Sequence, residues 1–251
     1  RINKIDTSPL YKKSEQIIGS LNKNRFKIIS KVPPLPVNIK KKDVKAWLNE
    51  NIVNSLKNLK IKNFECLLLH NSNILLGKKG NEIYKSIRSI KKQGLTRKIG
   101  LSIYDFGVLE KILKKFKFDL IQAPFSIFDR RMINEGWLKK LKRKKIKIHA
   151  RSVFLQGTLL LKKSKLPNKL KKFDNEWTLW ENWLRRNKLK PLEACISFVL
   201  NQSQLDGVVI GFDNRKQFNQ ILKLKKNKRD FYIENLRTNN KKLIDPRQWG
   251  N

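Results

Sequence analysis

The stretch IDTSPLY, residues Ile5–Tyr11, decides the fold and the chemistry that we expect of this chain. An apolar run that starts at Ile2 ends in this stretch at Asp6 and Thr7, and a short loop with a proline then leads to the tyrosine. The pattern indicates the carboxyl end of a β-strand that continues into a loop. In a barrel of parallel strands, catalytic groups lie at this end of the strands.

Two further apolar runs end in the same way. FKIISK (Phe26–Lys31) ends in a lysine, and CLLLH (Cys66–His70) ends in one of only two histidines. We therefore expect a phenol, an ammonium, a carboxylate and an imidazole on one face of one sheet, from Tyr11, Lys31, Asp6 and His70. These four groups together suit proton transfer to a carbonyl oxygen.

Apolar runs of strand length alternate along the chain with longer segments of helical period, which predicts parallel strands joined by crossover helices. We expect strands at Ile2–Thr7, Phe26–Val32, Phe64–His70, Lys98–Ser102, Asp119–Ala123, Ile146–Ala150 and Gly207–Ile210. We expect helices at Ser14–Leu21, Lys41–Leu59, Asn81–Gln93, Phe106–Phe116, Met132–Lys145, Glu176–Arg186, Leu192–Asn201, Asn214–Lys223 and about Asp230–Lys241. Ser14 is expected to cap the first helix and Gly94 to close the third.

These elements predict an α/β protein with a TIM (β/α)8 barrel. About seven strands are present, one fewer than a closed barrel needs. The sequence starts at Arg1 without a methionine and already inside a strand pattern, so we expect the first strand and helix to be missing at the amino end. No linker or low-complexity tract interrupts residues 1–251, which predicts a single domain.

Composition narrows the class of protein. We see no signal peptide and no apolar run near the ~18 residues that a membrane span needs, so we expect no membrane partner. The two cysteines, Cys66 and Cys195, both lie in apolar stretches. A reduced cytoplasmic location explains them most simply.

The net charge of +38, from 58 basic and 20 acidic residues, has two explanations. One is nucleic-acid binding through basic stripes, which would show a steep salt dependence. The other is compositional bias, because lysines are scattered over nearly every expected helix. We favour bias and expect neither a nucleic-acid partner nor a metal site, because zinc-finger spacing, ribonucleoprotein aromatics and a GxxG loop are all absent from the sequence.

The ordered set of motifs resembles the aldo-keto reductases. DTSPLYKKSEQIIG (Asp6–Gly19) is similar to the aspartate–tyrosine signature of that family, ISK (Ile29–Lys31) to its lysine strand and LLLH (Leu67–His70) to its histidine strand. Segments that resemble the cofactor-binding parts follow in family order: KIGLS (Lys98–Ser102), LIQAPFSIFDRR (Leu120–Arg131), ARSVFLQGTLL (Ala150–Leu160) and VVIGFDNRKQF (Val208–Phe218).

The resemblance implies NADPH-dependent interconversion of a small carbonyl compound and its alcohol. It implies that Tyr11 is the general acid, that Lys31 acts on the tyrosine, that Asp6 pairs with the lysine, and that His70 orients the carbonyl. Physical chemistry agrees with these roles. A free phenol, with a pKa near 10, is a weak acid at neutral pH, and a neighbouring ammonium favours the phenolate. A buried ammonium in turn needs a carboxylate beside it.

The cofactor residues also follow from the resemblance. Ser102 and Gln122 match the positions that hold the nicotinamide carboxamide, and Arg151 stands where many members have a stacking aromatic residue. The pyrophosphate is expected along Ser152, Phe154, Gln156 and Gly157. The adenosine end is expected at Gly211, Arg215 and Gln217, where Arg215 or Lys216 could meet the 2′-phosphate of NADPH. The basic loop Lys162–Lys172 could close over the phosphates or be a disordered loop.

Some positions depart from the family pattern. Lys12 replaces the glycine that usually follows the tyrosine, Ile103 replaces a frequent asparagine, and Ser126 replaces another. Taken singly, the aspartate, tyrosine, lysine and histidine of the expected site each have an ordinary structural explanation, and we interpret His149 as structural. The alternative function is therefore a non-catalytic barrel that binds a nucleotide or a partner, an inactive truncated paralogue.

Overall fold

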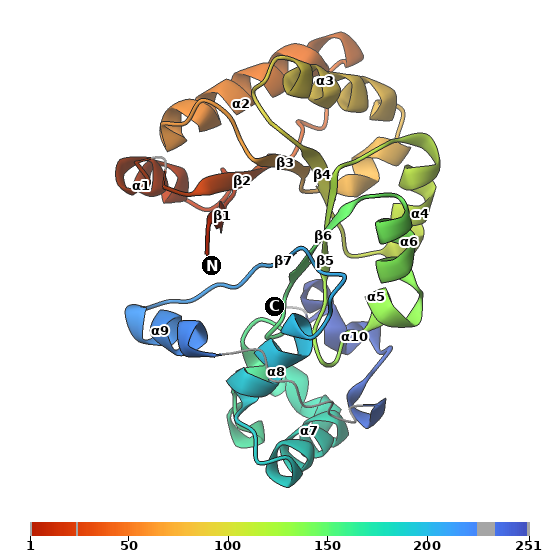
Figure 1. Cartoon of the computed structure of the whole chain (residues 1–251). Coiled ribbons are helices and arrows are strands. Elements are labelled where there is room, and N and C mark those ends of the chain that lie inside the picture. Colours follow the sequence, from red (N-terminus) through yellow and green to blue (C-terminus); the bar gives the residue numbers. More distant parts are fainter. Residues whose placement is uncertain (1, 24, 225–233, 250–251) are drawn as a thin grey trace. The chain divides into compact units, whose positions relative to one another are not determined.

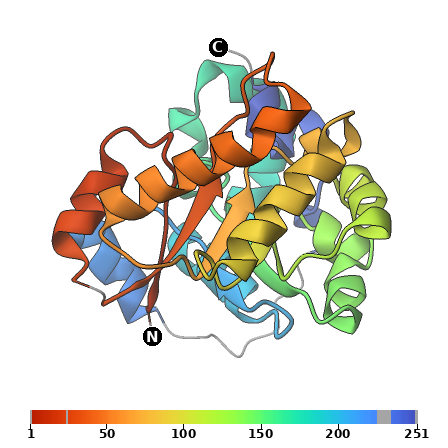
Figure 2. The same cartoon turned by 90° about the horizontal axis from the view of Figure 1, so that it is seen from above.

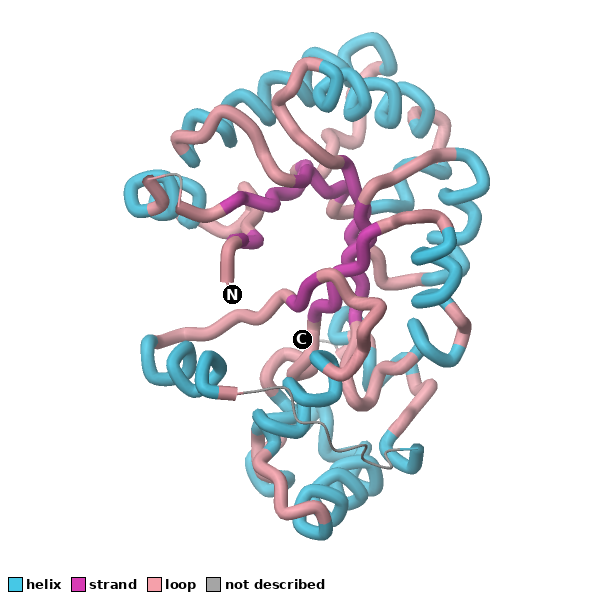
Figure 3. Tube along the Cα trace, in the orientation of Figure 1, coloured by secondary structure: helices cyan, strands magenta, loops and turns pink. Residues whose placement is uncertain are grey.

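The computed structural model describes residues 2–23, 25–224 and 234–249. Its contacts divide the chain into two compact units, Arg1–Gln122 and Ala123–Asn251, which are described in turn. In both units, strands alternate with helices along the chain (Figure 3). This alternation confirms the expected α/β class. The single domain expected over residues 1–251 stays a prediction.

The first unit contains a parallel sheet whose strands are hydrogen-bonded in chain order. The register pairs Asp6 with Ile29, Lys31 with Leu68, and Ser102 with Gln122, so the carboxyl ends of the strands lie at one edge. The strands are β1 (Lys4–Asp6), β2 (Lys27–Val32), β3 (Cys66–Leu69), β4 (Ile99–Ser102) and β5 (Leu120–Pro124), of which the last begins in this unit. The inner strands β3 and β4 are buried on both faces, as crossover helices require.

The helices of the first unit follow its strands and line one side of the sheet (Figure 1). They are α1 (Ser14–Leu21), α2 (Val44–Leu59), α3 (Gly80–Lys92) and α4 (Phe106–Lys115), with short 3-10 turns at Lys41–Asp43 and Ser72–Leu76. Helix α2 buries Val44, Leu48, Ile52, Leu56 and Leu59 at three- and four-residue spacing, as the sequence predicts. Seen from above, α2 and α3 lie side by side (Figure 2).

Among the described residues of the second unit, β6 (Lys147–Arg151) and β7 (Gly207–Val208) pair as parallel strands. The helices are α5 (Arg131–Asn134), α6 (Trp137–Arg143), α7 (Asp174–Arg186), α8 (Pro191–Leu200), α9 (Arg215–Lys223) and α10 (Lys241–Ile244). The described part of this unit also has 3-10 turns at Thr158–Leu160, Lys163–Lys165, Asn168–Phe173, Glu234–Leu236 and Pro246–Gln248.

An aromatic cluster forms the core of the second unit. The ring of Phe128 meets Trp177 and Trp180 edge-on, at centroid distances of 5.5 and 6.2 Å. The indole N–H of Trp180 donates to the Leu159 carbonyl at 3.1 Å. This contact holds the segment after β6 against α7, and the basic loop that follows also packs on α7, because Lys163 bonds Asp174 at 2.8 Å. The loop is therefore built into the unit.

Three expectations about helices are wrong. The helix expected at Met132–Lys145 is broken into α5 and α6, because Gly136 has a left-handed backbone with φ of +70°. Ser14 is the first helical residue and does not cap α1; its hydroxyl bonds the Thr7 hydroxyl at 2.9 Å. The closing helix expected from Asp230 lies partly outside the described residues, and residues 237–240 are not helical.

The expectation that Gly94 closes the third helix agrees with the structure. Gly94 follows the end of α3 with φ of +77°. Both cysteines are buried and free, and burial raises the pKa of the Cys66 thiol. Among the described residues, none of the helices combines the length and apolar character that crossing a bilayer requires.

Candidate active site

A buried ion pair lies at the carboxyl ends of β1 and β2. Lys31 Nζ donates to Asp6 Oδ1 at 2.5 Å and to the Thr7 carbonyl at 2.9 Å. Only 3% of the Lys31 side chain and 13% of the Asp6 side chain are exposed. A buried ammonium is costly unless a carboxylate and further acceptors surround it, and here the aspartate and the carbonyl supply those acceptors. The geometry brings together two of the residues that the sequence singles out.

Tyr11 lies beside this pair on a loop that is fixed by its own hydrogen bonds. Its amide donates to the Ser8 carbonyl at 3.0 Å, and its carbonyl accepts from the Ser14 amide at 2.9 Å. Lys31 Nζ lies 5.3 Å from the centroid of the tyrosine ring. Tyr11 is 48% exposed, whereas the Lys31 side chain beside it is buried.

The residue after the tyrosine explains how the loop keeps its path without the usual glycine. Lys12 has φ of +47°, a left-handed conformation that glycine adopts without strain and other residues adopt at a cost. The substitution that the sequence singles out therefore leaves strain in the loop that carries Tyr11.

His70 follows β3 directly and is half-buried. Leu68, two residues before it, is the register partner of Lys31. The imidazole thus belongs to the same edge of the sheet as the lysine, as the strand-end pattern predicts.

Ser102 is the last residue of β4, and Gln122 lies in β5. The two residues are register partners in the sheet. Both side chains are polar and almost fully buried, at 4% and 1% exposure. Gln122 Nε2 donates to Asp6 Oδ2 at 2.8 Å, a contact that the sequence does not predict. Ile103, at the position of the frequent asparagine, is a buried apolar residue whose amide bonds the Gln122 carbonyl at 2.9 Å.

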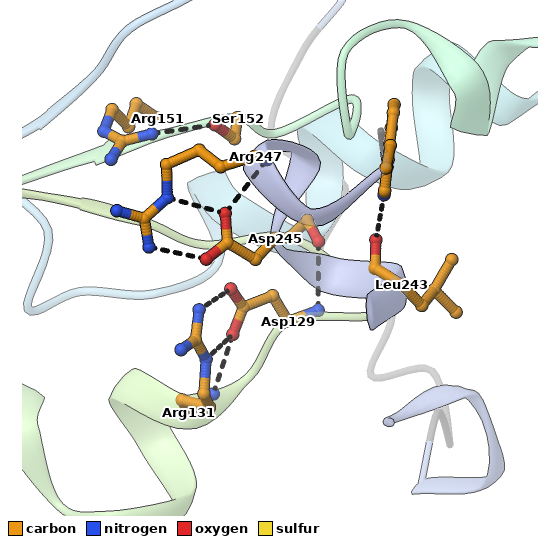
Figure 4. A network of polar contacts seen from close by, with 9 residues as sticks. Asp129, Arg131, Arg151, Ser152, Leu243, Asp245 and Arg247 are labelled. Carbon is orange, nitrogen blue, oxygen red and sulfur yellow. Dashed lines mark hydrogen bonds and ion pairs between the residues drawn. The ribbon is translucent and has the colours of Figure 1, made fainter. Parts of the chain in front are cut away.

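The expected pyrophosphate segment follows β6 in the second unit. Arg151, half-buried at the end of the strand, donates to the Ser152 hydroxyl at 3.1 Å (Figure 4). Ser152, Gln156 and Gly157 have positive φ, of +58°, +54° and +83°, so the segment is a series of tight turns. Phe154 is half-buried in the same segment.

The expected adenosine segment leads into α9, and one of its residues has a local structural task. Gln217 Oε1 accepts from the Asp213 amide at 2.8 Å, and the Gln217 amide donates to Asn214 Oδ1 at 3.0 Å. This reciprocal arrangement resembles a capping box, and the spacing N-x-x-Q could have indicated it from the sequence. Gly211 and Arg215 are exposed.

A network of arginines and aspartates in the second unit was not expected. Asp129 binds Arg131 through two hydrogen bonds of 2.8 and 2.7 Å, and Asp245 binds Arg247 through bonds of 2.8 and 2.5 Å (Figure 4). Burial lowers the pKa of Arg131, but the hydrogen bonds that Arg131 donates to Asp129 outweigh burial and keep the arginine pKa above its ordinary value. Burial raises the pKa of Asp245, but the hydrogen bonds from Arg247 outweigh burial. The pKa of Asp245 is therefore below its ordinary value.

Glu15 is a further buried charged residue that the sequence analysis does not predict. It is 3% exposed, at the first turn of α1, and accepts from the Ser30 hydroxyl at 3.3 Å. Burial raises its pKa, and hydrogen bonds from Ser55, Asn58 and Ser30 oppose that rise without cancelling it. Glu15 and Gly19, four residues apart, form the buried face of α1, whereas the apolar Ile17 is 55% exposed, so the helix does not bury its most apolar side.

Comparisons with known proteins show the family of this chain. The sequence matches the model of the Aldo/keto reductase family over residues 2–232. It is 28% identical over 169 residues to "Uncharacterized oxidoreductase YqkF" of Bacillus subtilis (strain 168), a match that covers 63% of this chain and 53% of that protein. The chain therefore matches about half the length of this relative.

Solved structures of the same family share the fold. The aldo-keto reductase AKR11C1 from Bacillus halodurans, in its holo form, superposes with a TM-score of 0.71 at 23% identity and covers 88% of this chain and 75% of that one. The glycerol dehydrogenase AKR11B4 from Gluconobacter oxydans has a TM-score of 0.62 at 18% identity, with 91% of this chain and 84% of that one covered. These structures confirm the expected (β/α)8 barrel class, of which the described part of the chain forms seven strands in one sheet. The family match covers most of the sequence, and this chain belongs to the aldo/keto reductase family.

Proposed function

We propose that the protein is an oxidoreductase that reduces a small aldehyde or ketone to the alcohol, with NADPH as hydride donor and Tyr11 as general acid. One observation carries this proposal: the Lys31 ammonium is held by Asp6 at 2.5 Å and lies 5.3 Å from the centroid of the Tyr11 ring. A phenol beside a buried cation, at the carboxyl ends of parallel strands, is the arrangement that proton donation to a carbonyl oxygen needs.

Each residue then has a definite task. Reduction builds negative charge on the carbonyl oxygen, and the exposed Tyr11 hydroxyl delivers a proton to it. The buried ammonium of Lys31 stabilises the negative charge that remains on the phenol oxygen. Asp6 holds the lysine ammonium in place, and His70, at the same edge of the sheet, orients the carbonyl group.

The polar residues at the strand ends fit a nicotinamide cofactor. Ser102 and Gln122 offer a hydroxyl and an amide in a buried setting, which matches the donors and acceptors of a carboxamide. Arg151 and Ser152, with the turns that follow, are proposed to contact the remainder of the cofactor. The exposed Arg215 and Lys216 at the start of α9 favour NADPH, because they can bind its additional phosphate. When bound, the cofactor supplies the hydride.

The proposal is tested by the decrease of NADPH absorbance with a panel of aldehydes and ketones. The name of one structural neighbour, glycerol dehydrogenase, makes glyceraldehyde a reasonable first substrate. We expect turnover by the wild-type chain and a loss of at least about a hundredfold in Tyr11→Phe. Tyr84→Phe is the matched control, because the Tyr84 hydroxyl bonds the Lys117 backbone at 2.9 Å, and we expect it to keep its activity. Equal activity of Tyr11→Phe and Tyr84→Phe would refute the role of Tyr11.

The alternative, a barrel that binds a nucleotide without catalysis, predicts a different result. NADPH would then quench the tryptophan fluorescence of the wild-type chain, yet no carbonyl compound of the panel would be reduced.

A further inference from the structure

We propose that Gln122 is a positioning residue for the proton donor as well as a cofactor ligand: it orients the carboxylate of Asp6, and through it the Lys31 ammonium beside Tyr11. This inference rests on the proposed function. It starts from the hydrogen bond of 2.8 Å between Gln122 Nε2 and Asp6 Oδ2, which joins residues 116 positions apart in the sequence.

The Asp6 carboxylate is held from two directions. Lys31, from β2, donates to Oδ1 at 2.5 Å, and Gln122, from β5, donates to Oδ2 at 2.8 Å. The terminal torsion of an aspartate is broad, so one donor alone leaves the carboxylate free to rotate. Two donors on different strands fix its plane, and the lysine that depends on it is fixed as well.

Asp6 and Gln122 differ in how deeply each is buried in the sheet, and this difference makes the glutamine important. Asp6 ends a strand of three residues whose side chains are all partly exposed. Gln122 is 1% exposed, within a strand whose residues are all buried. The glutamine is therefore the rigid partner, and it ties the aspartate of β1 to the interior of the sheet.

The same bond sets the direction of the glutamine amide. An ionised carboxylate can only accept hydrogen bonds, so the NH2 end of Gln122 must face Asp6. Its carbonyl end remains the acceptor that the NH2 group of a nicotinamide carboxamide needs. One side chain thus serves both tasks, and the residue that positions Asp6 also selects the orientation of the ring.

The test compares Gln122→Leu with Ser102→Ala, a variant of its register partner that lacks the contact with Asp6. Both are expected to raise the KM for NADPH. If Gln122 positions the acid, kcat at saturating NADPH falls about tenfold to a hundredfold further in Gln122→Leu than in Ser102→Ala, because small misplacements of reacting groups are costly. Equal kcat values in the two variants would show that the glutamine only binds the cofactor.

A second measurement needs no turnover. The protein is labelled with nitrogen-15 in its lysine side chains. The NMR signal of the Lys31 ammonium is then assigned as the signal that is missing from the spectrum of Lys31→Met. We expect this signal to move in Gln122→Leu and to stay in place in Ser102→Ala, and an unmoved signal in both variants would overturn the inference. If the wild-type chain reduces no carbonyl compound, the proposed function fails and this signal alone decides whether Gln122 positions the pair.

The isosteric variant Gln122→Glu covers the case in which Gln122→Leu does not fold. The introduced carboxyl group can donate to Asp6 only while it is protonated, so kcat of this variant should recover toward the wild-type value as the pH falls. A pH profile that runs parallel to that of the wild type would contradict the proposal.

Discussion

Gly19 of α1 lies so close to Asn58 of α2 that a β-carbon built on the glycine would be 2.1 Å from the Asn58 carbonyl oxygen. The obstacle is backbone, which cannot move aside as a flexible side chain can. The two helices therefore approach closely only because residue 19 has no side chain. Glu15, on the same face of α1, depends on this approach for its hydrogen bonds to α2.

We expect Gly19→Ala to lower the free energy of unfolding by about 1–3 kcal/mol, as overpacking does, or by more if α1 is displaced. Urea denaturation measures the change. Gly77→Ala is the control, because a β-carbon there would meet only the Ile74 carbonyl at 3.5 Å, an ordinary contact. Equal stability of the two variants would show that α1 and α2 are not packed as described.

Lys12 offers a prediction in the opposite direction. Its φ of +47° is left-handed, and a β-carbon in this region costs about 1–2 kcal/mol. Lys12→Gly should therefore raise the free energy of unfolding by up to about 1 kcal/mol, since the greater freedom of glycine in the unfolded chain offsets part of the relief. Lys13, the next residue, has φ of −85°, so Lys13→Gly should bring no gain. Urea denaturation of both variants measures the change in the free energy of unfolding. An equal gain in Lys13→Gly would contradict this explanation.

The strand–helix framework could be predicted because each element carries a local signal. A continuous apolar run marks β3, short segments rich in apolar residues mark β2 and β5, and a stripe at helical spacing marks α2. The pairing of Asp6 with Lys31 could be predicted as well, because both residues lie near the carboxyl ends of strands of one parallel sheet. Strand order and strand ends are sufficient to place these two groups at one edge.

Other features depend on contacts that no local pattern contains. The break between α5 and α6 depends on the backbone conformation of Gly136, whereas glycine inside a helical pattern is often tolerated. The bond from Gln122 to Asp6 depends on how far the sheet brings β5 toward β1. Glu15 is buried, and Ile17 is not, because Ser30 of β2 and Ser55 and Asn58 of α2 form hydrogen bonds with the Glu15 carboxyl group.

Asp206 should stabilise the second unit through three hydrogen bonds. It accepts from Lys142 and Lys147 at 2.8 Å each and from the Ile148 amide at 3.0 Å. Burial raises its pKa, but these donors outweigh burial and hold the pKa below the ordinary value of 3.8. The stabilisation is thus complete above pH 3.8 and is lost as the pH falls through the lower native pKa.

Asp206→Asn should cost about 1 kcal/mol near neutral pH and less in acid, because the two lysine donors are partly exposed and solvent weakens their ion pairs with Asp206. Denaturant titrations at several pH values measure the difference. Asp213→Asn, at an exposed aspartate, is the control and should change stability little at any pH. A cost for Asp206→Asn that stays constant down to strongly acidic pH would contradict the ion-pair explanation.

Glu15 predicts a pH dependence of the opposite sign. Burial raises its pKa above 4.5 in the folded chain, and the hydrogen bonds from Ser55, Asn58 and Ser30 do not cancel that rise. Between 4.5 and the higher native pKa, the folded state binds more protons than the unfolded state, so the free energy of unfolding falls as the pH rises. Glu15→Gln cannot ionise and should lose this slope, so the variant gains stability relative to wild type as the pH increases through that range. Glu50→Gln, an exposed position of α2, should follow the wild-type curve, and parallel curves for all three proteins would show that Glu15 is not buried as a carboxylic acid.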